Sequence, residues 1–147
     1  MAPPIELLRH VPLFSDLRKA DLERVAEAFT ERTFGTGDAI TEQGTAGTSF
    51  FIVAGGHATV TVRDRPVGTL GPGDAFGEVG LVDREHIRSA TVRAITDLHV
   101  FSVTFWDFEP LLDAYPSIAR RLLELLAARL RDADNRDDPI NPDLGDG

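Results

Sequence analysis

The chain has 147 residues, 42% of them hydrophobic and 27% charged, which is an ordinary composition for one globular domain with a single core. It contains no cysteine, which excludes disulfides, thiolate metal sites and cysteine nucleophiles. Its net charge of -9 argues against sequence-independent binding to nucleic acid, and it has neither a signal-peptide pattern nor a long apolar run. We therefore expect a cytoplasmic protein without a nucleic acid or membrane partner.

Residues 5–30 have a helical pattern. Within them, the sequence LRKADLERVAEAF places a set of apolar side chains on one helical face, namely Leu17, Leu22, Val25, Ala26 and Phe29. Pro12 and Ser15 predict a turn before this face begins. The first part of the domain is therefore expected to be helical.

The pattern then changes to short apolar runs separated by Gly, Pro and Asp over residues 33–104. The strand-length runs are residues 49–54, 57–63, 66–70, 89–94 and 98–103. In the second run, Ala58, Val60 and Val62 alternate with polar residues, which is typical of a strand with one buried face. Many short strands without helices between them predict an antiparallel sandwich or barrel.

Helical spacing returns over residues 105–131, with Ser117 as the expected N-cap of a long helix after Pro116. Two apolar stripes lie side by side on this helix: Ile118, Leu122 and Leu125 form one, and Leu123, Leu126 and Leu130 form the other. Two interpretations fit this wide face. The helix is either deeply buried, or it covers the β core and also meets a partner helix, as in a homodimer. Residues 132–147 are acidic and rich in Pro and Gly, which predicts a flexible tail.

Motifs for catalysis or metal binding are missing. The four histidines (His10, His57, His86 and His99) are scattered and are expected to be structural or on the surface. The sequence DADNRDD looks like a calcium loop, but Arg136 stands where a ligand belongs, so we expect no metal site. Neither a GxSxG elbow nor a GxxxxGK[ST] loop is present, and the sequence therefore does not predict an enzyme.

Residues 76–94 read FGEVGLVDREHIRSATVRA and combine a glycine turn, an acid and an arginine at the start of a strand. The guanidinium of Arg88 can hold a small anion such as phosphate through two parallel N–H bonds. If the turn is helical, the free N–H groups of Gly77, Glu78 and Val79 add positive potential. Glu78 can accept a hydrogen bond from a sugar hydroxyl. The alternative is a glycine turn in which Glu78 and Arg88 form a partly buried ion pair.

This stretch resembles the phosphate-binding cassette of cyclic nucleotide-binding domains, whose pattern is FGE, a small residue, apolar residues, a variable loop and R-[STA]-A-T-V-x-A. The upstream sequences VPLFSDL, FGTGDAITEQGTAG, FFIVAGGHATV and LGPGDAFGE look like that family's landmarks in the same order, so the resemblance covers residues 8–131. It implies a mainly β fold with flanking helices: a single domain over residues 1–131 with an N-terminal helical segment, an antiparallel jelly-roll barrel (β-roll) and a long C-terminal helix.

The resemblance also implies roles for individual residues. Arg88 would pair with the exocyclic phosphate oxygens, and Ser89 would add a hydroxyl or amide. Glu78 would accept from the ribose 2′-OH, with backbone contacts from Gly77 and Val79. Phe76 and Leu81 would pack the turn.

The offset of ten residues between Glu78 and Arg88 looks like the bacterial catabolite activator branch of the family. The sequence departs from that branch in two respects. The long helix is not followed by a helix-turn-helix domain, and Ala133 stands where the branch has a hydroxyl or amide that caps adenine. Arg131 or Asn135 is the expected substitute for that base contact.

The expected function is a non-catalytic receptor for cyclic AMP, with cyclic GMP left open, that moves its C-terminal helix and acts on an effector protein that the sequence does not identify. The alternative from another class is a dimerisation or docking module with a degenerate pocket that needs no nucleotide. An enzyme of the cupin type is a third hypothesis, which requires clustered metal-binding histidines that this sequence lacks.

Overall fold

A computed structural model describes residues 1–134 of the chain. Asn135 and most of the acidic C-terminal segment, including Arg136 of the rejected calcium loop, lie outside the described residues. Among the residues described, no helix has both the length and the apolar character needed to cross a bilayer.

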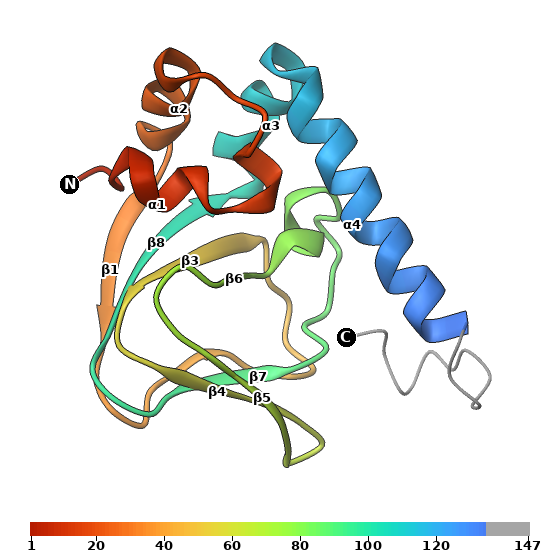
Figure 1. Cartoon of the computed structure of the whole chain (residues 1–147). Helices are drawn as coiled ribbons and strands as arrows, with labels where there is room; N and C mark the ends of the chain where they lie inside the picture. The colour runs from red at the N-terminus through yellow and green to blue at the C-terminus, as the bar shows by residue number, and fades with distance from the viewer. Residues whose placement is uncertain (135–147) are drawn as a thin grey trace.

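Two four-stranded antiparallel sheets form the centre of the molecule (Figure 1). One sheet has the order β1-β8-β3-β6 and the other the order β2-β7-β4-β5, so strands distant in sequence lie side by side. The strand bounds are β1 Thr30–Phe34, β2 Ala39–Thr41, β3 Ser49–Gly55, β4 Ala58–Val62, β5 Arg65–Leu70, β6 Ala75–Phe76, β7 Thr91–Ala94 and β8 Leu98–Thr104. The expected antiparallel jelly-roll with flanking helices is confirmed.

The sequence patterns predict β3, β4, β5, β7 and β8 but not β1, β2 and β6. Two of the missed strands, β2 and β6, have only three and two residues, too few to show a period of two. Strand β1 has the mostly polar sequence TERTF and begins at Thr30, inside the range predicted to be helical. The first helical segment therefore ends earlier than expected, at Ala26.

The N-terminal helices are α1 (Ile5–Arg9), the 3-10 helix η1 (Pro12–Phe14) and α2 (Lys19–Ala26). The predicted apolar face is confirmed, because Leu17, Leu22, Val25, Ala26 and Phe29 are all buried. These side chains pack with Phe50 and Phe101 of the sheet that contains β3 and β8. A second core cluster, which includes Phe51, Val53, Val92 and Val100, lies inside the roll.

Helices α3 (Phe105–Ala114) and α4 (Pro116–Asp134) follow the roll. The predicted N-cap at Ser117 is wrong: the helix begins at Pro116, whose missing N–H is not needed in a first helical turn. Helix α4 also extends past the expected end at residue 131.

The two stripes of α4 have different surroundings. Ile118 and Leu122 are buried in the core, whereas Leu123 and Leu130 expose 67% and 57% of their surface. The beginning of the helix is also held by Arg121, whose Nε and Nη2 donate to the carboxylate of Asp16 at 2.8 and 2.9 Å. These hydrogen bonds lower the pKa of Asp16 from its ordinary value. Leu126 of the second stripe is partly buried and also packs against this core. Helix α4 is therefore anchored mainly through the stripe of Ile118 and Leu122.

Leu122→Ala should lower the free energy of unfolding by about 2 to 5 kcal/mol, because it leaves a cavity in a fully packed core. Leu123→Ala, one position away on the exposed stripe, is the matched control and should change it by less than about 0.5 kcal/mol. Urea denaturation followed by circular dichroism measures both. Equal losses would contradict the one-sided anchoring of α4.

Candidate functional site

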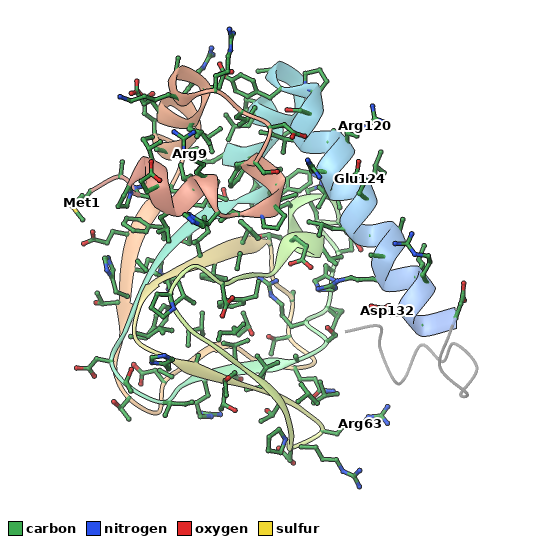
Figure 2. All side chains as sticks on the ribbon, in the orientation of Figure 1. Met1, Arg9, Arg63, Arg120, Glu124 and Asp132 are labelled. Carbon is green, nitrogen blue, oxygen red and sulfur yellow. The ribbon has the colours of Figure 1, made fainter. Side chains whose placement is uncertain are left out.

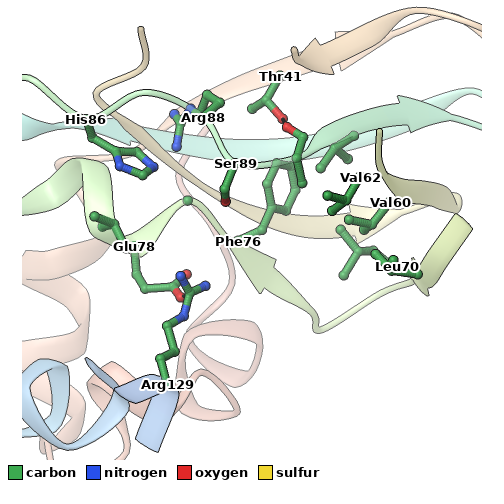
Figure 3. A pocket seen from close by; sticks show the side chains of 15 residues that line it. Thr41, Val60, Val62, Leu70, Phe76, Glu78, His86, Arg88, Ser89 and Arg129 are labelled. Carbon is green, nitrogen blue, oxygen red and sulfur yellow. Dashed lines mark hydrogen bonds and ion pairs between the residues drawn. The ribbon is translucent and has the colours of Figure 1, made fainter. Parts of the chain in front are cut away.

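A cavity of about 180 Å³ opens between the roll and α4 (Figure 3). One wall is apolar and comes from the two central strands and the end strand of the second sheet, through Val60, Val62, Leu70 and Val92. The opposite side is polar and comes from the predicted turn and loop, joined by one residue of α4; its side chains are Glu78, His86, Arg88, Ser89 and Arg129. The cavity therefore offers an apolar surface facing a group of charged side chains.

The predicted glycine corner is confirmed. Phe76 at the end of β6 pairs in register with Phe51 of β3, and their rings stack with centroids 5.0 Å apart. Gly77 then adopts a φ of 91°, a left-handed conformation that favours glycine, and the chain enters the 3-10 helix η2 (Glu78–Leu81). Leu81 is fully buried beneath this turn. Phe76 and Leu81 thus pack the corner as expected, and the turn orients Glu78 towards the cavity.

Arg88 lies in a tight cradle beside the corner and exposes only 7% of its surface. Its backbone pairs with the loop before β3: the N–H of Arg88 donates to the carbonyl of Thr45, and its own carbonyl accepts from Gly44, both at 2.8 Å. A Cβ placed on Gly47 would lie 2.0 Å from Nε of Arg88, and one on Gly77 would lie 2.9 Å from its Nη1. The guanidinium therefore fits only because two neighbouring residues lack a side chain.

The hydrogen bonding of the Arg88 guanidinium is incomplete. Its Nη2 donates to the backbone carbonyl of Ser49 at 2.6 Å, a neutral partner. Within residues 1–134, no carboxylate forms an ion pair with it. Burial lowers the pKa of Arg88 from its ordinary value, and the nearby charge of Glu78 partly offsets this effect. A buried arginine remains a cation, so its unused N–H groups favour an anion in the cavity.

Glu78 forms an ion pair with Arg129 of α4, and not with Arg88. The alternative of a Glu78–Arg88 ion pair is therefore wrong in this structure. The Glu78 side chain is 14% exposed and that of Arg129 is 37% exposed, so the contact is half-buried. Arg129 connects the far half of α4 to the glycine corner.

The sequence analysis did not identify Arg129, although a signal was present. Ile118, Leu122 and Leu125 occupy one stripe of α4, and Arg129 is the next position on that stripe. An arginine that continues an apolar stripe indicates a charged partner on the packed side of a helix. That partner is the acid of the glycine corner.

The other predicted residues divide into two groups. Gly77, Val79 and Ser89 line the cavity, and their contacts with a ligand remain predictions. Arg131 is exposed and does not line it, and neither does Ala133. Asn135 lies outside the described residues, so the base contacts assigned to Arg131 and Asn135 remain predictions. Thr41 lines the cavity although the sequence analysis did not select it.

The histidines are distributed as the sequence suggested, with one exception. His10 contacts the backbone carbonyl of Glu6 at 2.7 Å, His57 is exposed, and His99 lies beside Glu31. His86 instead lines the cavity. Among the residues that the structure describes, no three His, Asp or Glu side chains form a group that could hold a metal ion.

Comparison with known proteins identifies similar sequences and structures. The family model described as "Cyclic nucleotide-binding domain" matches residues 31–115. The "Cyclic AMP receptor protein" of Thermus thermophilus is 34% identical over 84% of this chain and 59% of its own length. The crystal structure of Thermus thermophilus catabolite activator protein superposes with a TM-score of 0.77, over 84% of this chain and 60% of that one.

A third similar structure is the regulatory domain of Toxoplasma gondii PKA, crystallised with cAMP. It has 29% identity and a TM-score of 0.65, over 72% of this chain and 42% of that one. The chain thus spans 59% of the length of the Thermus thermophilus relative and 42% of the Toxoplasma gondii chain.

Gly47→Ala tests the cradle around Arg88. The added methyl group must displace a buried guanidinium, so we expect a loss of about 1 to 3 kcal/mol in the free energy of unfolding. Gly68→Ala is the control, because a Cβ on Gly68 meets nothing within 4 Å. Chemical denaturation of both variants measures the difference, and similar stabilities would show that Arg88 is not tightly enclosed.

Proposed function

Because the chain belongs to the cyclic nucleotide-binding domain family, we propose that it is a non-catalytic receptor module that binds cyclic AMP and transmits binding through α4. The observation that carries this proposal is the buried guanidinium of Arg88, which has only a neutral partner within residues 1–134 and lies in one cavity with Glu78. A cyclic nucleotide presents an anionic phosphate and a sugar hydroxyl side by side. The cavity has a cation for the first and an acceptor for the second.

Three polar side chains of the cavity, Arg88, Ser89 and Glu78, contact the ligand in this proposal. The unused N–H groups of Arg88 bind the exocyclic phosphate oxygens, and Ser89 adds its hydroxyl or amide beside them. Glu78 accepts a hydrogen bond from the ribose 2′-OH, and the backbone of Gly77 and Val79 completes the corner. The apolar wall faces the base. Arg131 and Asn135 remain the proposed polar contacts to the base.

Cyclic AMP is proposed ahead of cyclic GMP because the Thermus thermophilus relative is named a cyclic AMP receptor and the Toxoplasma gondii domain was crystallised with cAMP. Val60, Val62 and Leu70 contribute contact area to either purine without hydrogen bonds that distinguish them. Competition between the two nucleotides decides this point.

Helix α4 is connected to the ligand site through Arg129. When a ribose hydroxyl donates to Glu78, it competes with Arg129 for the same carboxylate, so the energy of the contact between α4 and the corner changes with ligand. The first half of α4 has no such dependence, because Ile118 and Leu122 are fixed in the core. We therefore assign the switch to the second half of the helix.

A second candidate function is a dimerisation or docking module that needs no nucleotide. The side chains of Leu123 and Leu130 on α4 favour it, since both are apolar and the rest of the described chain leaves them exposed to solvent. A homodimer through the helix after Pro116 is also compatible with the receptor function, with an effector protein as its output.

Arg88→Ala should lower the affinity for cyclic AMP by several kcal/mol, of the order of 3 to 5, because it removes a buried charge-assisted contact. Glu78→Ala should cost about 1 to 3 kcal/mol, as expected for one hydrogen bond to a charged acceptor. Isothermal titration calorimetry measures both variants. Arg120→Ala is the control, because Arg120 lies on the outer face of α4 with its side chain 84% exposed (Figure 2).

The wild-type titration separates the two candidate functions. If neither cyclic AMP nor cyclic GMP gives a heat of binding or a thermal shift while light scattering shows a dimer, the docking function replaces the receptor function. Wild-type binding that Arg88→Ala leaves intact would show that the phosphate does not bind at Arg88.

Hydrogen–deuterium exchange tests the role of α4. We expect cyclic AMP to change amide protection over residues 123–134 in the wild-type chain, and this change to shrink strongly in Arg129→Gln, which cannot pair with Glu78 as a cation. Arg120→Gln is the matched control on the same helix. A ligand-dependent change that is identical in Arg129→Gln and wild type would disprove coupling through this pair.

A further inference from the structure

His86 is the one histidine among the described residues that lines the cavity, and it lies two residues before Arg88. Its backbone is fixed at both ends: its N–H donates to Asp83 at 3.1 Å, and its carbonyl accepts from Gly47 at 3.2 Å. Figure 3 shows the imidazole ring directed into the cavity, beside the guanidinium of Arg88 and above Glu78. The loop therefore holds this ring at the polar side of the cavity.

The ring has no hydrogen bond or ion pair within residues 1–134, although it is half-buried. Its neighbours Glu85 and Ile87 are exposed, so the chain turns His86 alone towards the cavity. An imidazole with two free nitrogens next to a binding arginine is a donor available to the same ligand.

Charged groups from every neighbouring segment act on the ring. Arg88, which lies in the loop before β7, and Arg129 of α4 oppose its protonation, whereas Asp83 of its own loop and Glu78 of η2 favour it. Burial has the largest effect, and together these influences lower the pKa of His86 from its ordinary value. In the free protein these influences together favour the neutral ring.

We propose that His86 is a further ligand residue: its imidazole faces the phosphate held by Arg88 and takes up one proton from solvent when the cyclic nucleotide binds. This inference rests on the proposed function, because it requires an anion at Arg88. The phosphate neutralises part of the repulsion from Arg88 and supplies an acceptor for the imidazolium N–H. The result is a binding site whose affinity depends on pH through a residue that the cassette pattern leaves variable.

The sign of the pH dependence follows from linkage. Binding raises the pKa of His86 from a depressed value in the free protein, so the bound state holds more protons. Affinity for the cyclic nucleotide should therefore increase as pH falls through the interval between the bound and free pKa values. Above that interval it should be constant. One unit of pKa difference corresponds to about a tenfold gain in affinity.

Calorimetric titration of the full chain with cyclic AMP from about pH 8 to about pH 5.5, a range centred on histidine titration, tests the proposal. For the wild type we expect affinity to rise by about three- to tenfold towards the acidic end. Titrations in buffers with different ionisation enthalpies should show uptake of up to one proton. His86→Gln keeps a polar side chain but should abolish both effects. His57→Gln, at an exposed position, should preserve them.

Glu78 and Asp83 are present in both the wild type and His86→Gln, so their contribution to the pH dependence of binding is common to both titrations. A direct measurement covers the case in which His86→Gln folds poorly. The chain has four histidines, so NMR titration of their imidazole signals can follow each ring with and without ligand. We expect the pKa of His86 alone to rise on binding.

The outcomes are distinct. Binding with a pH slope that is absent in His86→Gln supports the inference. Binding whose pH slope is flat in wild type, or equal in wild type and His86→Gln, overturns it and leaves the proposed function standing. Absence of binding at every pH overturns the proposed function itself.

Discussion

The structure depends on the burial of one cation. Arg88 exposes 7% of its surface and donates to a neutral carbonyl, whereas a charge removed from water normally needs an opposite charge. The surroundings enforce this position: Gly47 and Gly77 leave room for the guanidinium, and the loop before β3 fixes the backbone of Arg88. Removing the arginine charge from water costs free energy, and this cost is met when the protein folds. Because some of its N–H donors remain unused, the guanidinium is preorganised to bind an anion.

The roll brings this cation and the acceptor Glu78, which are ten residues apart in the chain, to the same cavity from two directions. Stacking of Phe51 on Phe76 ties β6 to β3, and the left-handed Gly77 then turns the chain into η2. Arg88 approaches from the other direction, in the loop that leads into β7. Because β3 belongs to one sheet and β7 to the other, the site forms only when both sheets have closed, so binding and folding are coupled through the same contacts.

The sequence predicted the parts of the site that short local patterns define. It missed those that depend on contacts between residues distant in sequence or on the direction of a loop side chain. The corner from Phe76 to Leu81, the position of Arg88 and the core strands follow from glycine chemistry and from alternating or apolar runs. Arg129 was missed because its partner lies about fifty residues away in sequence, and only the continuation of the Ile118 stripe indicated it. His86 was taken for a structural or surface residue, because periodicity does not show which way a loop side chain points. Strand β1 was missed because a polar edge strand has little apolar pattern to detect.

The strengths of the contacts determine which part of the molecule can respond to a ligand. Arg121 and Asp16, together with Ile118 and Leu122, anchor the first half of α4 at the core. The second half is connected to the cavity through Arg129, and a partly exposed ion pair of this kind contributes only about 0 to 1 kcal/mol. In the proposed function, a hydrogen bond from a ligand hydroxyl to Glu78 contributes about 1 to 3 kcal/mol, so it can replace the ion pair with Arg129. In the proposed function, ligand binding therefore acts on the end of α4 and leaves the roll that holds Arg88 unchanged.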